Sequence, residues 1–141
     1  PEILEFATIQ KKPFIGLCLG MQLLASKGTE FGDRDGLGLI EGTVIKLSTP
    51  DKNVRIPHVG WNNIDVKPGK KMYEGIAAPL DYYFVHSFYL STNDNSVVSG
   101  TCFHGQEFVA SVEKDNIWGA QFHPEKSQRA GLGLLTNFLK V

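Results

Sequence analysis

The sequence has 141 residues, of which 42% are apolar and 21% are charged, and this balance is typical of an ordinary globular domain. Its net charge of −1, from 14 basic and 15 acidic residues, gives no indication of a protein that binds nucleic acids or of a basic face that binds membranes. No apolar run reaches membrane-spanning length, and no signal peptide is visible. The two cysteines, Cys18 and Cys102, do not form the pattern of a disulfide framework, so we expect a cytoplasmic protein.

The first predicted elements are a short helix, a strand and a second helix. Apolar residues at positions 3, 4, 6, 7 and 9 form a helical stripe that ends before Pro13. Phe14–Leu17 is typical of a buried strand, and residues 21–27 contain good helix formers. Between them lies Gly16-Leu17-Cys18-Leu19-Gly20, the thiol form of the Gly-x-Ser-x-Gly nucleophile elbow.

The physics of this turn explains the residues around Cys18. A strand that turns directly into a helix holds its middle residue in a sparsely populated backbone conformation, and glycines let neighbouring elements approach without a clash. The thiol then projects from the carboxyl end of the strand, where the N-terminus of the helix favours the thiolate. A simpler alternative remains, because cysteine is often a small buried apolar residue and glycine often marks a turn.

Only 17 residues precede Cys18. An elbow strand normally lies in the middle of a parallel sheet, with strands on both sides. We therefore expect residues 1–141 to form a single domain that is incomplete at its N-terminus.

The middle and end of the chain predict several strands and a final helix. Residues 28–38 contain four glycines and lack the Gly-Lys-Ser/Thr ending of a phosphate cradle, so they predict an irregular loop. Strands are expected at residues 43–47, 63–66, 81–90, 97–103, 106–112 and 117–122, with a hairpin turn at His104-Gly105. Ser127 is expected to cap a helix with a buried stripe of Leu132, Leu135, Phe138 and Leu139. Helix–strand alternation at both ends, with extra strands between, predicts an α/β sheet with an antiparallel insertion.

A histidine and a glutamate follow the strand predicted at residues 117–122. His123 and Glu125 flank Pro124, and residues two apart in an extended chain point the same way. The carboxylate can then hold one ring nitrogen while the other takes the proton of Cys18, which also follows a strand end. Alone, such a sequence is equally a surface turn, but its combination with the elbow favours catalysis.

The remaining histidines do not indicate a metal site. His58, His86 and His104, with Cys102, are scattered in the sequence and lack the close paired spacing of metal ligands. We therefore expect neither a metal nor a cofactor, and we interpret Cys102 as the interior residue of a strand.

Three segments resemble the signatures of class I (triad) glutamine amidotransferases. They are Gly16-Leu17-Cys18-Leu19-Gly20-Met21-Gln22, Tyr83-Phe84-Val85-His86-Ser87-Phe88 and Gln121-Phe122-His123-Pro124-Glu125. Pro57-His58-Val59-Gly60-Trp61-Asn62 and Lys126 narrow the resemblance to the glutaminase subunits of imidazole glycerol phosphate synthase, in histidine biosynthesis. The resemblance runs from about Lys12 to the C-terminus. It implies a three-layer α/β sandwich around a mainly parallel sheet, with a flavodoxin-like core and an antiparallel insertion.

The resemblance also implies a role for each matching residue. Cys18 attacks the side-chain amide of glutamine to form a thioester, His123 shuttles the proton and Glu125 orients the imidazole. The backbone amide of Leu19 donates to the oxyanion. Contacts with the substrate glutamine are implied for Gln22, for Glu30 and for the backbone of His86, Ser87 and Phe88.

A protein partner is implied as well. It is a cyclase subunit built as a (β/α)8 barrel, which forms a heterodimer with the glutaminase and receives its ammonia screened from water. The ammonia then reacts with a phosphoribosyl-ribonucleotide intermediate. The face that meets the cyclase is implied to contain His58, Trp61, Asn62, Tyr83 and Lys126. Core packing is the alternative for Trp61 and for the aromatic residues of segment 82–89.

The chain departs from the family pattern in one respect. The second oxyanion donor of the family comes from a glycine-rich strand before the nucleophile strand, but residues 1–13 contain no glycine. Because losing one donor lowers the rate by about 100- to 1000-fold, we expect activity of the parent domain rather than of this segment alone. Two other functions remain open. One is a glutaminase for another ammonia-using synthase or a thiol hydrolase of γ-glutamyl peptides, and the other is a non-catalytic interaction module with a relic triad.

Overall fold

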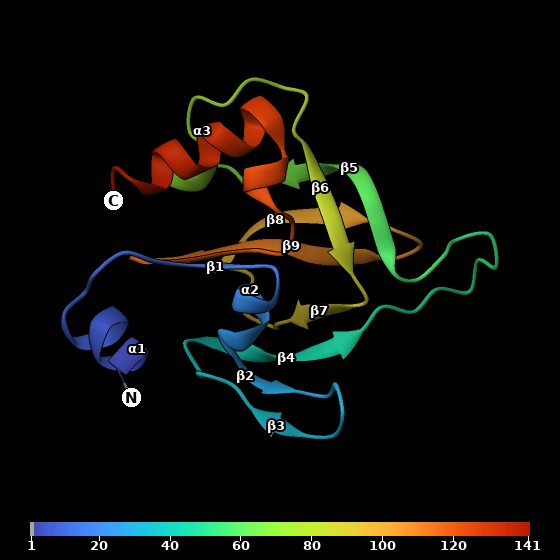
Figure 1. Cartoon of the computed structure of the whole chain (residues 1–141), viewed down its shortest axis with the longest axis horizontal. Helices are drawn as coiled ribbons and strands as arrows, with labels where there is room; N and C mark the ends of the chain where they lie inside the picture. Colours follow the sequence, from blue (N-terminus) through green and yellow to red (C-terminus); the bar gives the residue numbers. More distant parts are fainter. Residues whose placement is uncertain (1) are drawn as a thin grey trace.

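The computed structural model describes residues 2–141 (Figure 1). Its helical segments are α1 (Glu2–Leu4), which continues into the π-helical turn η1 (Glu5–Ile9), α2 (Leu19–Leu23), the 3-10 turns η2 (Lys71–Tyr73) and η3 (Pro124–Lys126), and α3 (Gln128–Phe138). Its strands are β1 (Phe14–Leu17), β2 (Ala25–Gly28), β3 (Arg34–Asp35), β4 (Ile40–Lys46), β5 (His58–Val66), β6 (Asp81–His86), β7 (Phe88–Ser91), β8 (Val98–Phe103), β9 (Glu107–Lys114) and β10 (Ile117–Ala120). Within residues 2–141, no helix is long and apolar enough to cross a membrane.

The strands form two mixed sheets. The larger sheet has the order β1-β10-β9-β8-β5-β6, and the smaller has the order β3-β2-β4-β7. Pairing is parallel between β1 and β10 and between β2 and β4, and the other pairs are antiparallel. The predicted α/β class is confirmed, but the parallel part is smaller than expected. Tight turns join β8 to β9 and β9 to β10, and strands joined in this way can pair only antiparallel.

The aromatic stretch predicted as one strand is divided between the two sheets. β6 pairs with β5 at the edge of the larger sheet, whereas β7 pairs with β4 in the smaller sheet. Ser87 lies at the break, where its carbonyl accepts a hydrogen bond of 2.8 Å from the backbone amide of Leu47. His86 and Phe88, two residues apart, therefore belong to different sheets.

Two clusters of buried side chains lie on opposite faces of the larger sheet. The cluster beneath α3 includes Tyr82, Phe84, Trp118, Phe122 and Leu134. The cluster around α2 and the smaller sheet includes Met21, Leu24, Ile40, Leu90 and Val112. Ile117 and Trp118 are neighbours in β10 but belong to different clusters, as expected because adjacent side chains of a strand point to opposite faces. α3 and α2 therefore lie on opposite sides of the larger sheet (Figure 1).

Two helix predictions were partly wrong. α2 ends at Leu23, and much of the segment predicted to continue it forms β2, because pairing with β4 overrides local helix propensity. In α3, Gly131 and Leu134 are buried, whereas Leu132 is 63% exposed and Leu139 is 84% exposed. Leu135 and Phe138 are half-buried, and Phe138 packs against the core as predicted. The close approach of Gly131 to Pro124 sets this orientation of the helix and leaves the other two leucines outside the buried face.

Candidate active site

The nucleophile elbow forms as the sequence predicts. β1 runs parallel to β10, and the backbone amide of Cys18 extends this pairing by donating to Ala120 O at 2.8 Å. Cys18 itself has φ +50° and ψ −108°, a strained conformation for a residue with a side chain. Gly16 is required here because a Cβ atom on it would collide with the backbone of Gly20. The strained turn presents the thiol at the carboxyl end of β1.

The surroundings of the thiol do not favour the thiolate as strongly as expected. Burial raises the pKa of Cys18 and the nearby Glu125 carboxylate raises it further, whereas hydrogen bonds from the Leu19 backbone amide and the Gln121 side chain lower it. The net shift of the pKa is upward. The expectation of an activated thiolate is therefore corrected, since the short helix α2 does not outweigh burial. A base is needed to remove the proton of Cys18.

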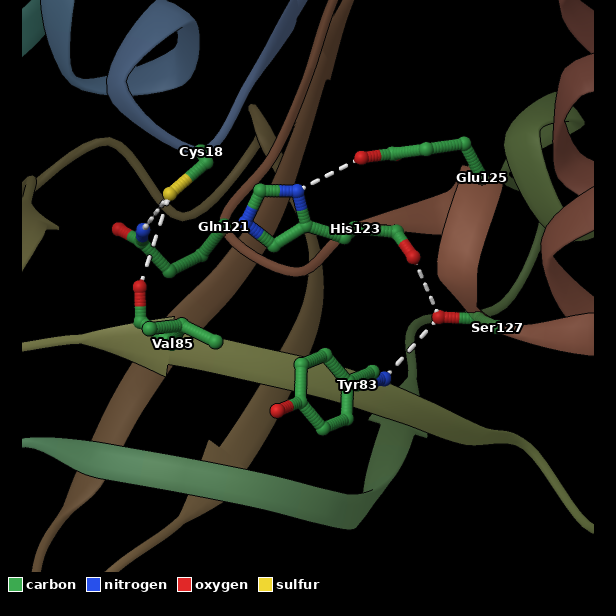
Figure 2. A network of polar contacts seen from close by, with 7 residues as sticks. All are labelled: Cys18, Tyr83, Val85, Gln121, His123, Glu125 and Ser127. Carbon is green, nitrogen blue, oxygen red and sulfur yellow. Dashed lines mark hydrogen bonds and ion pairs between the residues drawn. The ribbon is translucent and has the colours of Figure 1, made fainter.

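His123 is placed to be that base. Its Nδ1 atom lies 2.7 Å from Glu125 Oε1, and because an ionised carboxylate only accepts, Nδ1 carries the proton. The other ring nitrogen is left free on the side of Cys18 (Figure 2). The pairing arises differently from the prediction, because η3 turns the chain at Pro124 and brings Glu125 back to the ring. Within residues 2–141, no hydrogen bond joins Cys18 Sγ to the imidazole.

The backbone around His123 is fixed by Ser127 and β6. The amide of His123 donates to Tyr83 O at 2.9 Å. Ser127 Oγ donates to His123 O at 2.6 Å and accepts from the Tyr83 amide at 3.0 Å (Figure 2). Ser127 precedes α3 but makes no side-chain cap, so the predicted capping role is wrong. Its hydroxyl instead links the backbone of His123 to that of Tyr83 in β6.

The motif also contains a site residue that the sequence reasoning missed. Gln121 is fully buried, accepts from Gln22 Nε2 at 3.2 Å and directs its own Nε2 toward Cys18 Sγ at 3.8 Å. The thiol also lies 3.7 Å from Val85 O. Figure 2 shows these two contacts of the sulfur. The available signal was a polar residue at the end of an apolar strand, two positions before His123.

The predicted substrate contacts are only partly gathered at this site. Gln22 donates to Phe88 O at 3.0 Å and is therefore held close to the thiol network. The carbonyl of Phe88 also accepts from His86, and that of Ser87 accepts from the amide of Leu47, just after β4, so both are already engaged within the chain. Glu30 is exposed in the turn between β2 and β3, and no hydrogen bond links its side chain to another described residue.

The predicted interface residues divide into a surface group and a buried one. Trp61 is 50% exposed and packs edge-on against Tyr83, with a ring-centroid distance of 5.9 Å. Lys126 is exposed and Asn62 is half-buried. His58, by contrast, is only 3% exposed and lies beneath this surface, so its ring forms no part of an exposed face.

The histidines described as scattered in the sequence are together in space. The ring centroid of His58 lies 5.0 Å from that of His86 and 4.1 Å from that of His104. Their spacing in the sequence did not indicate this cluster, which arises because the pairing of β5 with β6 places His58 directly opposite His86. Among residues 2–141, no group of three or more His, Cys, Asp or Glu side chains is arranged to hold a metal ion.

Comparisons with known proteins agree with this geometry. The family model of glutamine amidotransferase class-I matches residues 1–141. Imidazole glycerol phosphate synthase subunit HisH 1 of Campylobacter jejuni (strain RM1221) is 49% identical over 137 residues, which are 97% of this chain and 67% of that protein. Subunit HisH of Pyrococcus furiosus is 46% identical over 131 residues, which are 92% of this chain and 66% of that protein. The chain thus spans about two thirds of the length of these relatives.

Solved structures share the fold at lower identity. A glutamine amidotransferase from Thermotoga maritima aligns with a TM-score of 0.64 and 17% identity, covering 99% of this chain and 52% of that one. Another glutamine amidotransferase aligns with a TM-score of 0.70 and 18% identity, covering 99% of this chain and 65% of that one. The chain therefore belongs to the class I glutamine amidotransferase family. The narrower resemblance to the glutaminase subunits of imidazole glycerol phosphate synthase is likewise confirmed by the curated relatives.

Proposed function

We propose that this chain carries the glutaminase site of an imidazole glycerol phosphate synthase. The reaction is hydrolysis of the side-chain amide of glutamine to glutamate and ammonia, and the ammonia is delivered to a cyclase subunit. The observation that supports this proposal most strongly is the 2.7 Å contact between His123 Nδ1 and Glu125 Oε1, next to a thiol held in a strained elbow. The names of the relatives, at up to 49% identity, support the same reaction.

The proposed chemistry begins with proton transfer. The free nitrogen of His123 removes the proton of Cys18, and the sulfur attacks the amide carbon of glutamine. The imidazolium, held by Glu125, then gives its proton to the departing nitrogen, which leaves as ammonia. Water attacks the resulting thioester and releases glutamate, restoring the thiol. The raised pKa of Cys18 makes this base necessary, because little thiolate forms without it.

The oxyanion of the intermediate is proposed to bind at the start of α2. The Leu19 backbone amide already lies close enough to the sulfur to lower the pKa of Cys18. A donor in this position also faces the carbonyl oxygen of a substrate attached to that sulfur. Gln22 and Glu30, with the backbone of His86, Ser87 and Phe88, are proposed to hold the rest of the glutamine.

A (β/α)8-barrel cyclase is the proposed partner. The proposed contact surface contains Trp61, Tyr83, Asn62 and Lys126. His58 is proposed to support this surface from the buried side. Support comes from the exposed apolar side chains of Trp61 and Val59 on one face of β5, since exposed aromatic residues are frequent anchors of protein interfaces. The predicted cytoplasmic location fits a biosynthetic enzyme of this kind.

The decisive experiment replaces the nucleophile in the full-length protein with its cyclase partner. Cys18→Ala should abolish glutamine-dependent synthesis and leave synthesis from added ammonium salt intact, because the cyclase has its own site. Loss of both activities would show that the division of labour is wrong.

Two further measurements separate the remaining alternatives. Ammonia release from glutamine should rise when the barrel subunit is added, and a lack of response would favour another synthase or a γ-glutamyl hydrolase. An electrophile that mimics glutamine should label Cys18 in the presence of the partner. A full-length protein that gives no adduct would instead be an interaction module with a relic triad.

A further inference from the structure

A row of buried side chains connects β5 to the site and takes no part in the mechanism above. His58 Nδ1 lies 2.9 Å from His86 Nε2, and His86 Nδ1 lies 2.8 Å from Phe88 O. A carbonyl oxygen only accepts, so Nδ1 of His86 must carry the proton. When the His86 ring is neutral, its Nε2 is then an acceptor, so His58 must donate to it from Nδ1. A neutral His58 ring that donates from Nδ1 must in turn accept at its own Nε2. The donor at that position is Asn62 Nδ2, at 3.2 Å.

The outer end of the row fixes the same direction independently. The backbone amide of Asn63 donates to Asn62 Oδ1 at 2.9 Å, and Asn62 Nδ2 also donates to Phe103 O at 2.9 Å. The amide nitrogen of Asn62 therefore faces His58, as the inner end requires. Backbone groups at both ends thus assign every proton in the row to one position.

Both imidazoles are held in the neutral form that this row needs. His58 is 3% exposed and His86 is 6% exposed. Burial, with a smaller effect of His104, lowers the pKa of His58 to about 3. Burial lowers the pKa of His86 to about 4, although its hydrogen bond to the Phe88 carbonyl opposes this shift. Neither ring is protonated near neutral pH, so the direction of the hydrogen bonds is maintained.

The row continues from the Phe88 carbonyl to the nucleophile. Gln22 Nε2 donates one proton to Phe88 O and the other to Gln121 Oε1. With its oxygen engaged, Gln121 directs Nε2 toward Cys18 Sγ. The orientation of the Gln22 amide is set by the Phe88 carbonyl, and that of the Gln121 amide is set by Gln22. Rotating either amide would bring two oxygens or two N–H groups together.

We propose that His58 and His86 are positioning residues of the glutaminase site, which fix the Phe88 carbonyl and, through Gln22, turn the N–H of Gln121 toward the sulfur of Cys18. The inference rests on the proposed function and extends it to two imidazole side chains that are given no contact with the sulfur or the substrate in that proposal. Without a fixed Phe88 carbonyl, both glutamine amides can rotate and place an oxygen against the sulfur. That arrangement disfavours the thiolate.

The first test is the tautomer of the two rings, read from the ring-nitrogen resonances of the full-length protein by NMR at about pH 7. Both His58 and His86 should be protonated at Nδ1, whereas free histidine in water favours protonation at Nε2. Either ring protonated at Nε2, or at both nitrogens, overturns the proposal. This test needs no catalytic activity, so it is independent of the proposed function.

The second test is the pH dependence of alkylation of Cys18 by iodoacetamide, followed on the peptide that contains it. His58→Phe and His86→Phe keep an aromatic ring but remove the hydrogen bonds, and each should move the alkylation profile about 0.5 pH unit or more upward. His104→Phe is the matched control, because His104 stacks on His58 but lies outside the row. The charged and titratable groups near the thiol, Glu125, Lys126 and His123, are the same in all variants.

The kinetic outcome separates positioning from a loss of folded protein. His58→Phe should lower kcat/KM for glutamine about tenfold, because it leaves a buried acceptor of His86 unpaired, and His58→Asn should recover part of that loss through its amide donor. A folded His58→Phe protein that behaves like His104→Phe in alkylation and in kcat/KM would overturn the proposal. An inactive wild-type protein with both rings in the predicted tautomer would instead count against the proposed function alone.

Discussion

At the scale of single residues, the site depends on a balance around one sulfur. Burial and the Glu125 carboxylate raise the pKa of Cys18, and the Leu19 amide and the Gln121 side chain lower it. Because burial prevails, the proposed mechanism needs His123 to take the proton of the thiol. Glu125 contributes by fixing the ring through Nδ1 rather than by touching the thiol.

Removal of the orienting carboxylate should therefore be milder than removal of the base. In the full-length protein with its partner, both Glu125→Ala and His123→Ala should reduce kcat for glutamine hydrolysis. The fold-loss for Glu125→Ala should be smaller by about tenfold, because an orienting acid usually contributes less than the base. Glutamate release under saturating glutamine measures both losses. Equal losses would contradict the orienting role.

The elbow itself makes a sharper prediction about two neighbouring glycines. Gly16→Ala should lower the free energy of unfolding by about 1–3 kcal/mol, because the new methyl group meets the backbone of Gly20 and something must shift. Gly20→Ala is the control, since a Cβ atom there has no neighbour within 4 Å and alanine favours the helix by about 1 kcal/mol. Urea denaturation compares the two, and equal destabilisation would contradict the packing argument.

At the scale of elements, the site is held together by packing between α3 and η3. Gly131 lies so close to Pro124 that a Cβ atom would overlap its carbonyl group. Pro124 begins η3, which carries Glu125, and Ser127 connects the same turn to β6. The position of the carboxylate thus depends on how closely α3 approaches the turn.

Substitution within α3 should consequently reach the active site. Gly131→Ala should displace η3 and reduce kcat for glutamine by about tenfold or more, because small displacements of positioned groups are costly in catalysis. Gly133→Ala is the control, since its Cβ atom would meet only the flexible side chain of Ile76, at 3.0 Å. The measurement is kcat per folded molecule in the two variants. Equal losses of kcat would contradict the coupling between α3 and the active site.

The pairing of β5 with β6 should make the fold sensitive to acid. His58 and His86 have folded-state pKa values near 3 and 4, below the ordinary value of 6.5, so the unfolded chain binds more protons as the pH falls below that value. The free energy of unfolding should therefore decrease on acidification from neutrality, by up to about 1.4 kcal/mol per pH unit for each histidine.

Urea denaturation at a series of pH values tests this expectation. His58→Phe removes one of the two titrating rings and should make the decline with falling pH shallower. An unchanged slope in that variant would show that the buried histidines do not set the acid sensitivity.

At the scale of the whole molecule, the outer surface of β5 and β6 presents apolar side chains to solvent. Val59 pairs with Val85 across these strands, and Trp61 pairs with Tyr83. Val59, Trp61 and Val85 are all exposed. An apolar, aromatic surface of this kind is typical of a contact with another protein. The surface also adjoins the active site, because the carbonyl of Val85 in β6 faces the thiol of Cys18.

Trp61→Ala should therefore weaken binding of the cyclase subunit without unfolding the chain. We expect the Kd to rise about tenfold or more, because exposed tryptophans are frequent hot spots of interfaces. Leu139→Ala is the control, since Leu139 is an exposed apolar residue beyond the end of α3. Titration calorimetry with the purified barrel subunit gives the Kd of both variants. Equal Kd values would show that Trp61 does not contribute to the interface.

The local chemistry of this protein can be predicted from its residues. The elbow needs glycine at a close approach and a small nucleophile in a strained turn, and a proline between His123 and Glu125 restricts the chain near both side chains. These are short-range constraints, so the strand preceding each motif and the family could be predicted from residues alone, and Cys18, His123 and Glu125 could be proposed as the catalytic residues. The class of fold followed from the alternation of elements.

The contacts between residues far apart in the chain, by contrast, follow only from the three-dimensional packing. The split of segment 81–90 at Ser87, the burial of His58 opposite His86, the rotated face of α3 and the contact of Gln121 with the sulfur all depend on strand register and on packing between layers. Burial also reversed the expected shift in the pKa of Cys18. Such interactions join residues far apart in the chain, and local sequence patterns carry little information about them because their geometry is set by the whole sheet.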